Sequence, residues 1–264
     1  MTSTRLWDRA ADLPMVAGRR PRPEIVALPA AGLPTVAELF TFMRDAELRF
    51  DALRMRIEER SFGVAGEQVA IVEVALRHPT DARVTTSQPA LGTTANYELW
   101  ISDGEVVRTY SAPHRLGTER PVRRSVVGIS GRESRDLPGT SRVYAPLTAL
   151  PMETLPEVFV HPAGYCQNVL STGACRIVGL DAVGGREAIV VECDHPRTIE
   201  IGADRPDYRI RISVDRADGV ILRLEESIGG IVTRDARVTE YEPDAPLSPN
   251  TFDFTFPTGT TMLY

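Results

Sequence analysis

Alternation of apolar and polar residues predicts a series of strands in the last third of the chain. In the range 207–215 every second residue is apolar, which indicates a strand with one buried and one solvated face. Asp218-Gly219 then marks a tight turn, because glycine adopts positive φ without steric cost. Similar turns at Gly184-Gly185 and Gly229-Gly230 separate further apolar runs. We predict an antiparallel meander with strands at 176–180, 187–193, 207–215, 220–225, 231–241 and 252–257.

A helix is predicted to precede the strands. Thr35 and Glu38 have the spacing of a capping box, in which each side chain accepts a hydrogen bond from the other residue's backbone amide. Apolar residues then recur every three or four positions, which gives the helix one apolar face. That face either packs against a sheet as core or borders a cavity for an apolar ligand, since Met and Phe adapt to variable shapes. Its residues are Val36, Leu39, Phe40, Met43, Ala46, Phe50 and Leu53.

The pattern changes to strands after this helix. Short apolar runs follow one another at regular spacing, and Asp103-Gly104 is typical of a hairpin turn. The run 69–76 is apolar on both faces, which predicts a central strand covered on both sides. We predict strands at 53–62, 67–77, 82–88, 96–102, 105–111 and 120–127.

Two segments lack this regularity. Residues 1–34 are rich in Pro and Arg and are predicted to form a partly disordered arm, so the folded domain is expected to span 35–264. An irregular apolar insertion interrupts the domain at 128–173, and within it 131–142 is a polar, Arg-rich loop. Residues 147–170 are apolar but contain three prolines, which favours short helical turns over the sheet. They form either a lid or a structural cover.

Composition narrows the function classes. The net charge of −6 gives no electrostatic support for nucleic-acid binding. All 30 basic residues are Arg, so neither a Schiff-base lysine nor a phosphate-loop lysine is available. No apolar run reaches the roughly 18 residues that span a bilayer, and the N-terminus lacks the apolar core of a signal peptide. We expect a cytoplasmic protein as the sequence is written, and an extracytoplasmic one if the native start lies further upstream.

Candidate catalytic and metal-binding residues are few. In Cys193-Asp194-His195, adjacent strand residues point to opposite faces, so Asp194 would not face the other two side chains. The spacing of Cys166, Cys175, Cys193 and His195 matches no common zinc site. We therefore expect no catalytic residue, no metal and no cofactor. In a reducing compartment the three cysteines are thiols, whereas in an oxidising one Cys166 and Cys175 are candidates for a disulfide.

The order of these parts resembles a known superfamily. A capped amphipathic helix and several strands lead to SDGEVVRTYSAP at 102–113, and the apolar insertion follows. Next come IVGLDAVGGREAIVVEC at 177–193, YRIRISVDRADGVILRLEE at 208–226 and FDFTFP at 252–257. Over residues 35–259 this arrangement is similar to the LolA/LolB/LppX superfamily of lipoprotein and lipid carriers, which includes the related domain of the sigma-factor regulator RseB.

The resemblance implies a mainly β (α+β) fold, a curved antiparallel half-barrel of about eleven strands with helices covering its concave face. It also implies non-catalytic binding of an acyl chain or lipid-like molecule between sheet and helices. The alternative is an RseB-like regulatory role on a sigma/anti-sigma or other signalling partner, contacted by the arm and the loop 131–142. The sequence lacks the signal peptide and lipid-attachment cysteine of such carriers. For a ligand cavity we predict Phe40, Met43, Val72, Val74, Trp100, Tyr110 and Phe159.

Overall fold

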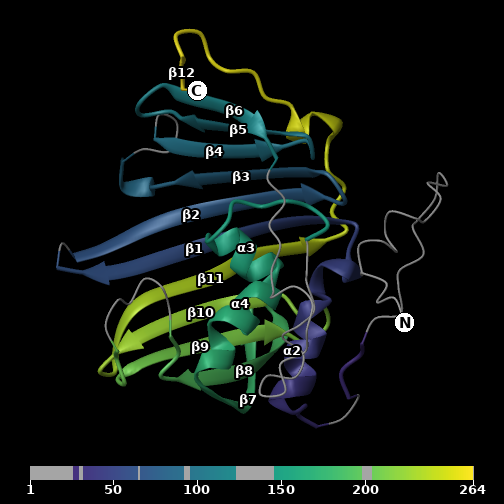
Figure 1. Ribbon diagram of the computed structural model, residues 1–264, viewed down its shortest axis with the longest axis vertical. Coiled ribbons are helices and arrows are strands. Elements are labelled where there is room, and N and C mark those ends of the chain that lie inside the picture. The colour runs from purple at the N-terminus through teal and green to yellow at the C-terminus, as the bar shows by residue number, and fades with distance from the viewer. Residues whose placement is uncertain are drawn as a thin grey trace.

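The predicted antiparallel meander is present as one curved sheet. The computed structural model describes residues 26–29, 32–64, 66–91, 96–122, 146–197 and 204–263. Twelve strands follow the order β12-β6-β5-β4-β3-β2-β1-β11-β10-β9-β8-β7, and β12–β6 is the parallel pair (Figure 1). The strands are β1 (Ala52–Gly63), β2 (Gly66–Arg77), β3 (Asp81–Ser87), β4 (Tyr97–Ser102), β5 (Val106–Ser111), β6 (Leu116–Pro121), β7 (Ala174–Val183), β8 (Arg186–Asp194), β9 (Tyr208–Asp215), β10 (Ile221–Ile228), β11 (Ile231–Pro243) and β12 (Thr261–Leu263).

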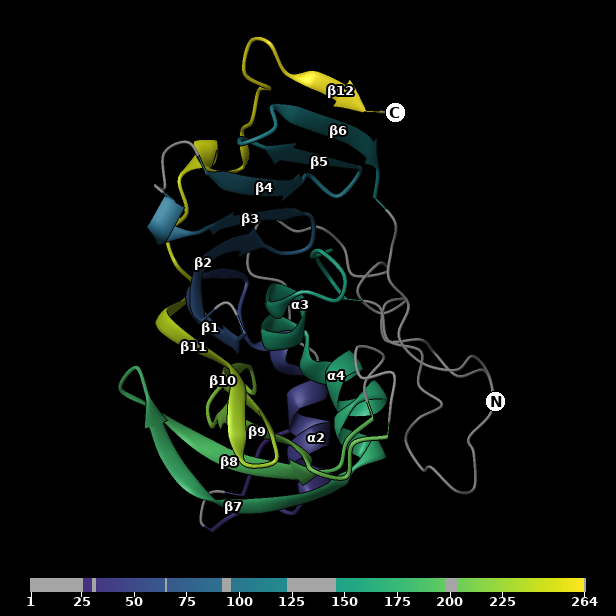
Figure 2. The same ribbon diagram turned by 90° about the vertical axis from the view of Figure 1, so that its left-hand side faces the viewer.

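Short helices cover the concave face of this sheet (Figure 2). The predicted helical turns within 147–170 are confirmed as α3 and α4, and the predicted N-terminal helix is α2. The helices are α2 (Val36–Arg44), α3 (Leu155–Val160) and α4 (Pro162–Asn168), with 3-10 turns η1 (Ala46–Arg49), η2 (Pro89–Leu91), η3 (Leu170–Thr172) and η4 (Pro249–Phe252). Most of the arm 1–34, apart from 26–29 and 32–34, and the whole loop 131–142 lie outside the described residues.

The capping box of α2 forms as predicted. The Glu38 amide donates to Thr35 Oγ1 at 3.2 Å, and the Thr35 amide donates to Glu38 Oε2 at 2.7 Å. These hydrogen bonds lower the pKa of the Glu38 carboxyl, because they favour its charged form.

Removal of this cap is expected to lower the stability of the protein by a small, measurable amount. Thr35→Ala is expected to lower the free energy of unfolding by about 1 kcal/mol, because the orphaned amide of the first turn loses its acceptor. Urea denaturation measures the change. Thr41→Ala is the control, since the Thr41 hydroxyl only donates back to the Ala37 carbonyl within the same helix. Equal losses in the two variants would contradict a specific capping role.

The lower half of the sheet is tightly filled. Strands β7 to β11 curve around α2 and α4 (Figure 2), and the side chains between them form one continuous core. Leu39, Phe42 and Met43 of α2 are buried there, whereas Phe40 is half-buried. The predicted apolar face of the helix therefore omitted Phe42. It also included Leu53, which belongs to β1 and not to the helix. The largest fully buried side chains include Phe50, Phe159, Leu39, Met43, Leu53, Met55, Ile57 and Leu76.

The convex face carries a second, smaller cluster at the other end of the sheet. Leu99, Ile101 and Tyr110 point to this face and are covered by the C-terminal segment. The prediction of a strand at 252–257 is wrong, since η4 and an extended segment run across the sheet instead. The three phenylalanines Phe252, Phe254 and Phe256 alternate as in a strand, but they cover a sheet face rather than pair with an edge.

Two other predicted strands need correction. The strand placed at 120–127 begins earlier, because β6 covers Leu116–Pro121, and residues 123–127 lie outside the described residues. β2 is central in the sheet, but it is not covered on both faces over its whole length. On the convex side Ile71 is buried, whereas Glu73 is exposed and Ala75 is half-buried.

Two sequence motifs of the last third meet in one buried ion cluster. Arg186, from the GGRE turn, forms a bidentate pair with Asp215, with Nε–Oδ2 at 2.5 Å and Nη2–Oδ1 at 3.0 Å. Its Nη2 also donates to Asp218 Oδ2 at 2.8 Å, and Tyr241 Oη donates to the same oxygen at 3.0 Å. The Arg186 guanidinium lies 4.6 Å from the Tyr241 ring centroid. Burial raises the pKa of both Asp218 and Tyr241.

Candidate ligand-binding groove

A groove of about 620 Å³ lies on the concave side of the upper half of the sheet. Its floor is formed by one face of β2 to β6, and the start of α3 with the segment before it lies alongside. The register explains the floor, because residues directly opposite one another in a ladder share a face. Val84 lies opposite Trp100, Trp100 opposite Thr109, and Thr109 opposite Thr118.

The lining combines an apolar surface with a few polar groups. Thr109 Oγ1 and Thr118 Oγ1 are hydrogen-bonded to each other at 2.7 Å, which reduces the polarity of that part of the floor. The apolar side chains of the lining are Val72, Val84, Trp100, Leu116, Pro151, Leu155, Pro156 and Leu263; Leu99 and Tyr110 also border the groove, although their side chains point to the convex face. A volume of this size and a wall that combines apolar side chains with polar groups are typical of small-molecule sites.

Charged side chains lie among the lining residues and come from several elements. Glu59 of β1, Glu98 of β4 and Glu153 contribute carboxylates, and Arg234 of β11 contributes a guanidinium. Arg234 Nε is 2.6 Å from Glu59 Oε1, so its charge is paired within the protein. Because Arg234 neutralises Glu59, the remaining lining charges are the carboxylates of Glu98 and Glu153, which disfavour an anionic group.

The cavity residues predicted from the sequence do not all meet. Val72 and Trp100 line the groove from the concave face of the sheet. Tyr110 is also a lining residue, but its ring packs on the convex side, with centroids 5.9 Å from Phe254 and 6.5 Å from Phe256.

The other four predicted residues are not among the lining residues of the groove. Met43, Val74 and Phe159 are fully buried in the main core, and Phe40 packs against that core from its edge. Phe40 and Met43 lie on α2, which packs against α4 and β7 rather than over the groove floor. Val74 lies on β2 next to β3, but it borders the convex hollow instead.

Sequence reasoning missed several lining residues. Thr86, Thr109 and Thr118 lie on the floor, and their signal was the register of the predicted hairpins, in which every second residue faces the same side. Leu155 and Pro156 belong to the segment predicted as helical turns over the sheet, but the strands that it covers were not predicted. Leu263 had no local signal, because β12 is short and pairs in parallel with β6.

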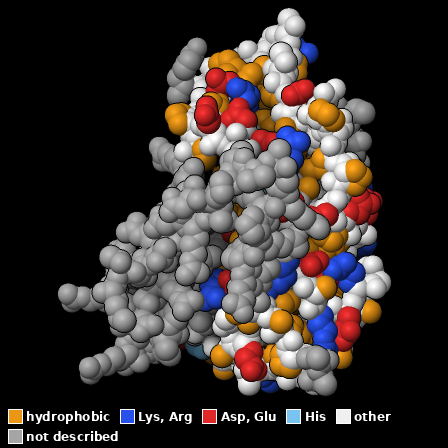
Figure 3. Space-filling model, turned by 90° about the vertical axis from the view of Figure 1, so that its right-hand side faces the viewer, with side chains coloured by type: hydrophobic (Ala, Val, Ile, Leu, Met, Phe, Trp, Pro, Cys, Tyr) orange, Lys and Arg blue, Asp and Glu red, His pale blue; other side chains and the backbone are white. Residues whose placement is uncertain are grey.

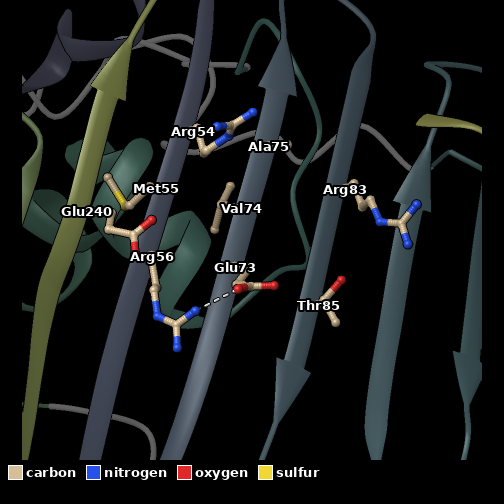
Figure 4. Close-up of a pocket in the computed structure, with 9 residues that line it drawn as sticks. All are labelled: Arg54, Met55, Arg56, Glu73, Val74, Ala75, Arg83, Thr85 and Glu240. Atoms are coloured by element: carbon tan, nitrogen blue, oxygen red, sulfur yellow. Dashed lines mark hydrogen bonds and ion pairs between the residues drawn. The ribbon is translucent and has the colours of Figure 1, made fainter. Parts of the chain in front are cut away.

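The convex face has a smaller hollow of about 230 Å³ (Figure 4). Most of its side chains are charged, and Arg56 Nη1 pairs with Glu73 Oε1 at 2.8 Å. Arg83 Nη1 donates to the carbonyl oxygens of Thr251 and Asp253 at 3.2 and 3.4 Å. These contacts make the convex hollow an internally paired surface. Seen from the side, the molecule also carries charged side chains of both signs among hydrophobic ones (Figure 3).

The Cys193-Asp194-His195 sequence is not assembled as a catalytic group. Cys193 is buried, Asp194 pairs with Arg176 and Arg209, and the His195 Nε2 lies 2.5 Å from Asp204 Oδ1. Among the described residues, no group of three or more His, Cys, Asp or Glu side chains is arranged to hold a metal. All three cysteines are free thiols, and the register places Cys175 opposite Cys193 rather than Cys166.

Comparison with known proteins finds no matching family model and no matching curated protein. Among solved structures, the chain is similar to MucB in the Pseudomonas aeruginosa MucA/MucB complex, with 14% identity and a TM-score of 0.46 over 83% of this chain. The match covers 60% of that MucB chain, which is less than two thirds of its length.

Two further solved structures match over nearly their whole length. Mycobacterium tuberculosis lipoprotein LppX matches with 9% identity, a TM-score of 0.42, and coverage of 81% of this chain and 98% of LppX. A LolA superfamily protein from Nitrosomonas europaea matches with 9% identity, a TM-score of 0.31, and coverage of 84% and 99%. The curved antiparallel sheet with helices on its concave face (Figure 2) agrees with the half-barrel that the sequence resemblance implied. At these identities and TM-scores the matches add no conclusion about this chain.

Within the part of the chain that the structure describes, no helix is long and apolar enough to cross a bilayer.

Proposed function

We propose that this protein binds a hydrophobic small molecule, of the acyl-chain or lipid-like class, in the groove above β2 to β6, without catalysing a reaction. The observation that carries the proposal is the groove itself, with its floor of Val72, Val84 and Trp100 and its side formed by Leu155 and Pro156. Burial of a methylene group contributes roughly 0.8 kcal/mol, so an apolar groove is sufficient for binding. No reactive side chain is needed.

The charges of the groove refine the ligand class. Because Glu98 and Glu153 line it and the charges of Glu59 and Arg234 offset each other, a neutral polar end is favoured over an anionic one. The Thr86 hydroxyl on the floor is available as a neutral hydrogen-bonding group. We therefore infer a ligand with an apolar chain over Trp100 and a neutral polar end, such as a fatty alcohol or a monoacylglycerol.

The test uses two adjacent residues of β3 that face opposite sides of the sheet. Thr86 lines the groove, whereas Thr85 lines the convex hollow. Thr86→Phe is expected to fill the groove and weaken binding of a brominated monoacylglycerol by about tenfold or more, and Thr85→Phe by less than about twofold. Binding is read as quenching of Trp100 fluorescence in a Trp7→Phe background, which leaves Trp100 as the one tryptophan.

Two results would contradict the proposal. If the brominated monoacylglycerol does not quench Trp100, the groove is not the binding site. If Thr85→Phe and Thr86→Phe weaken binding equally, the effect comes from the sheet as a whole. The inferred preference for a neutral end is tested by the matching brominated fatty acid, which is expected to bind more weakly at neutral pH and is contradicted if it binds as well.

A further inference from the structure

Two cysteines face each other across the last strand pair of the sheet. Cys175 lies on β7, the edge strand, and Cys193 lies directly opposite on β8. Residues directly opposite in an antiparallel ladder have Cα atoms about 4.5–5.5 Å apart. Disulfides form when the Cα atoms are about 4.4–6.8 Å apart. The backbone of β7 and β8 therefore already has the spacing that a disulfide requires.

Both sulfur atoms converge on one carbonyl group of the helical cover. Cys175 Sγ lies 3.1 Å and Cys193 Sγ lies 3.3 Å from the Leu170 carbonyl oxygen. Two thiols that lie directly opposite each other in one strand pair and share an acceptor form a pair rather than two independent buried cysteines.

The surrounding backbone keeps the pair close to this turn. A Cβ atom at Gly173 would lie 2.7 Å from Cys193 Sγ and 2.6 Å from the Asp194 carbonyl oxygen. Real Cβ atoms do not approach other atoms so closely, so glycine is required for the turn after η3 to pack here. The Gly173 amide also donates to the Leu170 carbonyl at 3.1 Å, which fixes that oxygen between the two thiols and the turn.

Accessibility separates the three cysteines. Cys175 is half-buried on the edge strand, whereas Cys193 and Cys166 are 1% and 5% exposed. Cys166 lies elsewhere in the core, with its sulfur 3.8 Å from Met43 Sδ of α2. An external reagent can thus reach Cys175 first, and Cys193 is the partner in position to react next.

We propose that Cys175 and Cys193 form a redox-active dithiol that is converted to a cross-strand disulfide by exchange with a small-molecule disulfide such as oxidised glutathione. In the first step the Cys175 thiolate attacks one sulfur of oxidised glutathione, which forms a mixed disulfide and releases one glutathione thiol. The Cys193 thiolate then attacks the Cys175 sulfur and releases the second glutathione thiol. The protein loses two protons and two electrons, together two hydrogen atoms, and one oxidised glutathione is reduced to two thiols.

Oxidation has a structural consequence at the helical cover. The disulfide has no S–H group, so the Leu170 carbonyl loses both thiol donors and keeps the hydrogen bond from the Gly173 amide. Leu170 begins η3, which follows α4 and connects the cover to β7. The oxidised protein is expected to show faster hydrogen exchange in 162–173 than the reduced protein, because this contact between cover and sheet is weakened.

The experiment exposes the folded wild-type protein and Cys166→Ala to a series of reduced and oxidised glutathione mixtures, followed by quenching, denaturation and alkylation. The wild-type protein is expected to change from three alkylated cysteines to one, and Cys166→Ala from two to none. Each protein should also lose the mass of two hydrogen atoms. In Cys166→Ala the disulfide must join the tryptic peptides 143–176 and 187–197, which contain Cys175 and Cys193.

Single-cysteine variants establish the order of events. Cys193→Ala is expected to stop at a mixed disulfide between glutathione and Cys175, and Cys175→Ala to react at least about tenfold more slowly because Cys193 is buried. Three alkylated cysteines in the most oxidising mixture would overturn the proposal, as would a disulfide that contains Cys166. Alkylation of Cys166 in the folded protein at the rate of Cys175 would also overturn it, because the thiols would then be reached through unfolding.

Discussion

Asp215→Ala is expected to lower the free energy of unfolding by about 3–5 kcal/mol, because it removes a buried carboxylate that holds both the half-buried Arg186 and the following turn, and leaves Arg186 with Asp218 alone. Asp215 is 1% exposed, and its two carboxylate oxygens accept both bonds from Arg186. Oδ1 also accepts the amides of Ala217 and Asp218 at 2.9 and 2.7 Å, which define the turn between β9 and β10. The substitution thus removes an ion pair and a turn at the same position.

Urea denaturation of Asp215→Ala, Arg186→Ala and the double variant measures both effects. The coupling energy of the ion pair is the loss of unfolding free energy in the double variant minus the sum of the losses in the two single variants. The contribution of the turn is the part of the Asp215→Ala loss that this coupling energy does not account for. Glu242→Ala is the control, since the Arg54–Glu242 pair is about half exposed on both sides and is expected to contribute less than about 1 kcal/mol. A loss in Asp215→Ala as small as the control would show that the motif has no stabilising role.

The same cluster shows what the sequence can predict. Alternation and the Gly-containing turns are local signals, so the strands and hairpins of β7 to β11 were placed within a few residues. The motif around Asp215 and Asp218 was recognised as a hairpin signature. The contacts of this motif with Arg186 of the preceding hairpin and with Tyr241 of β11 were not predicted. They depend on which strands lie side by side in the sheet, and no local pattern gives that order.

Non-local pairing accounts for the errors in the fold. The alternating phenylalanines at 252–256 satisfy the local rule for a strand, but the edge they would pair with is taken by β12. A parallel three-residue strand has no local signature, so neither β12 nor the contribution of Leu263 to the groove was predictable.

The candidate site was only half predictable for a related reason. Periodicity identifies which residues of an element face inward, but it does not say whether the space they face is filled by another element. Val72 and Phe159 both face inward. Val72 is 4% exposed and belongs to the main core but also borders the groove, whereas Phe159 of α3 lies within that core and does not border the groove. The difference comes from the position of α3 over the sheet.

Phe159→Ala distinguishes these two environments. Phe159 is fully buried in the main core and does not line the groove, so the substitution is expected to lower the free energy of unfolding by about 3–5 kcal/mol. Quenching of Trp100 by the brominated monoacylglycerol is expected to change by less than about twofold, measured at a temperature where the variant is folded. Circular dichroism and urea denaturation establish that condition.

Phe159→Leu is the matched control. It retains most of the apolar volume, so it is expected to lose less stability than Phe159→Ala and to leave Trp100 quenching unchanged. The opposite pattern, with little loss of stability and a strong loss of quenching in Phe159→Ala, would mean that ligand and not protein contacts this ring. In that case the ligand-binding space would extend beneath α3 into the lower half of the sheet. The conclusion that protein side chains fill the core around Phe159 would then be wrong.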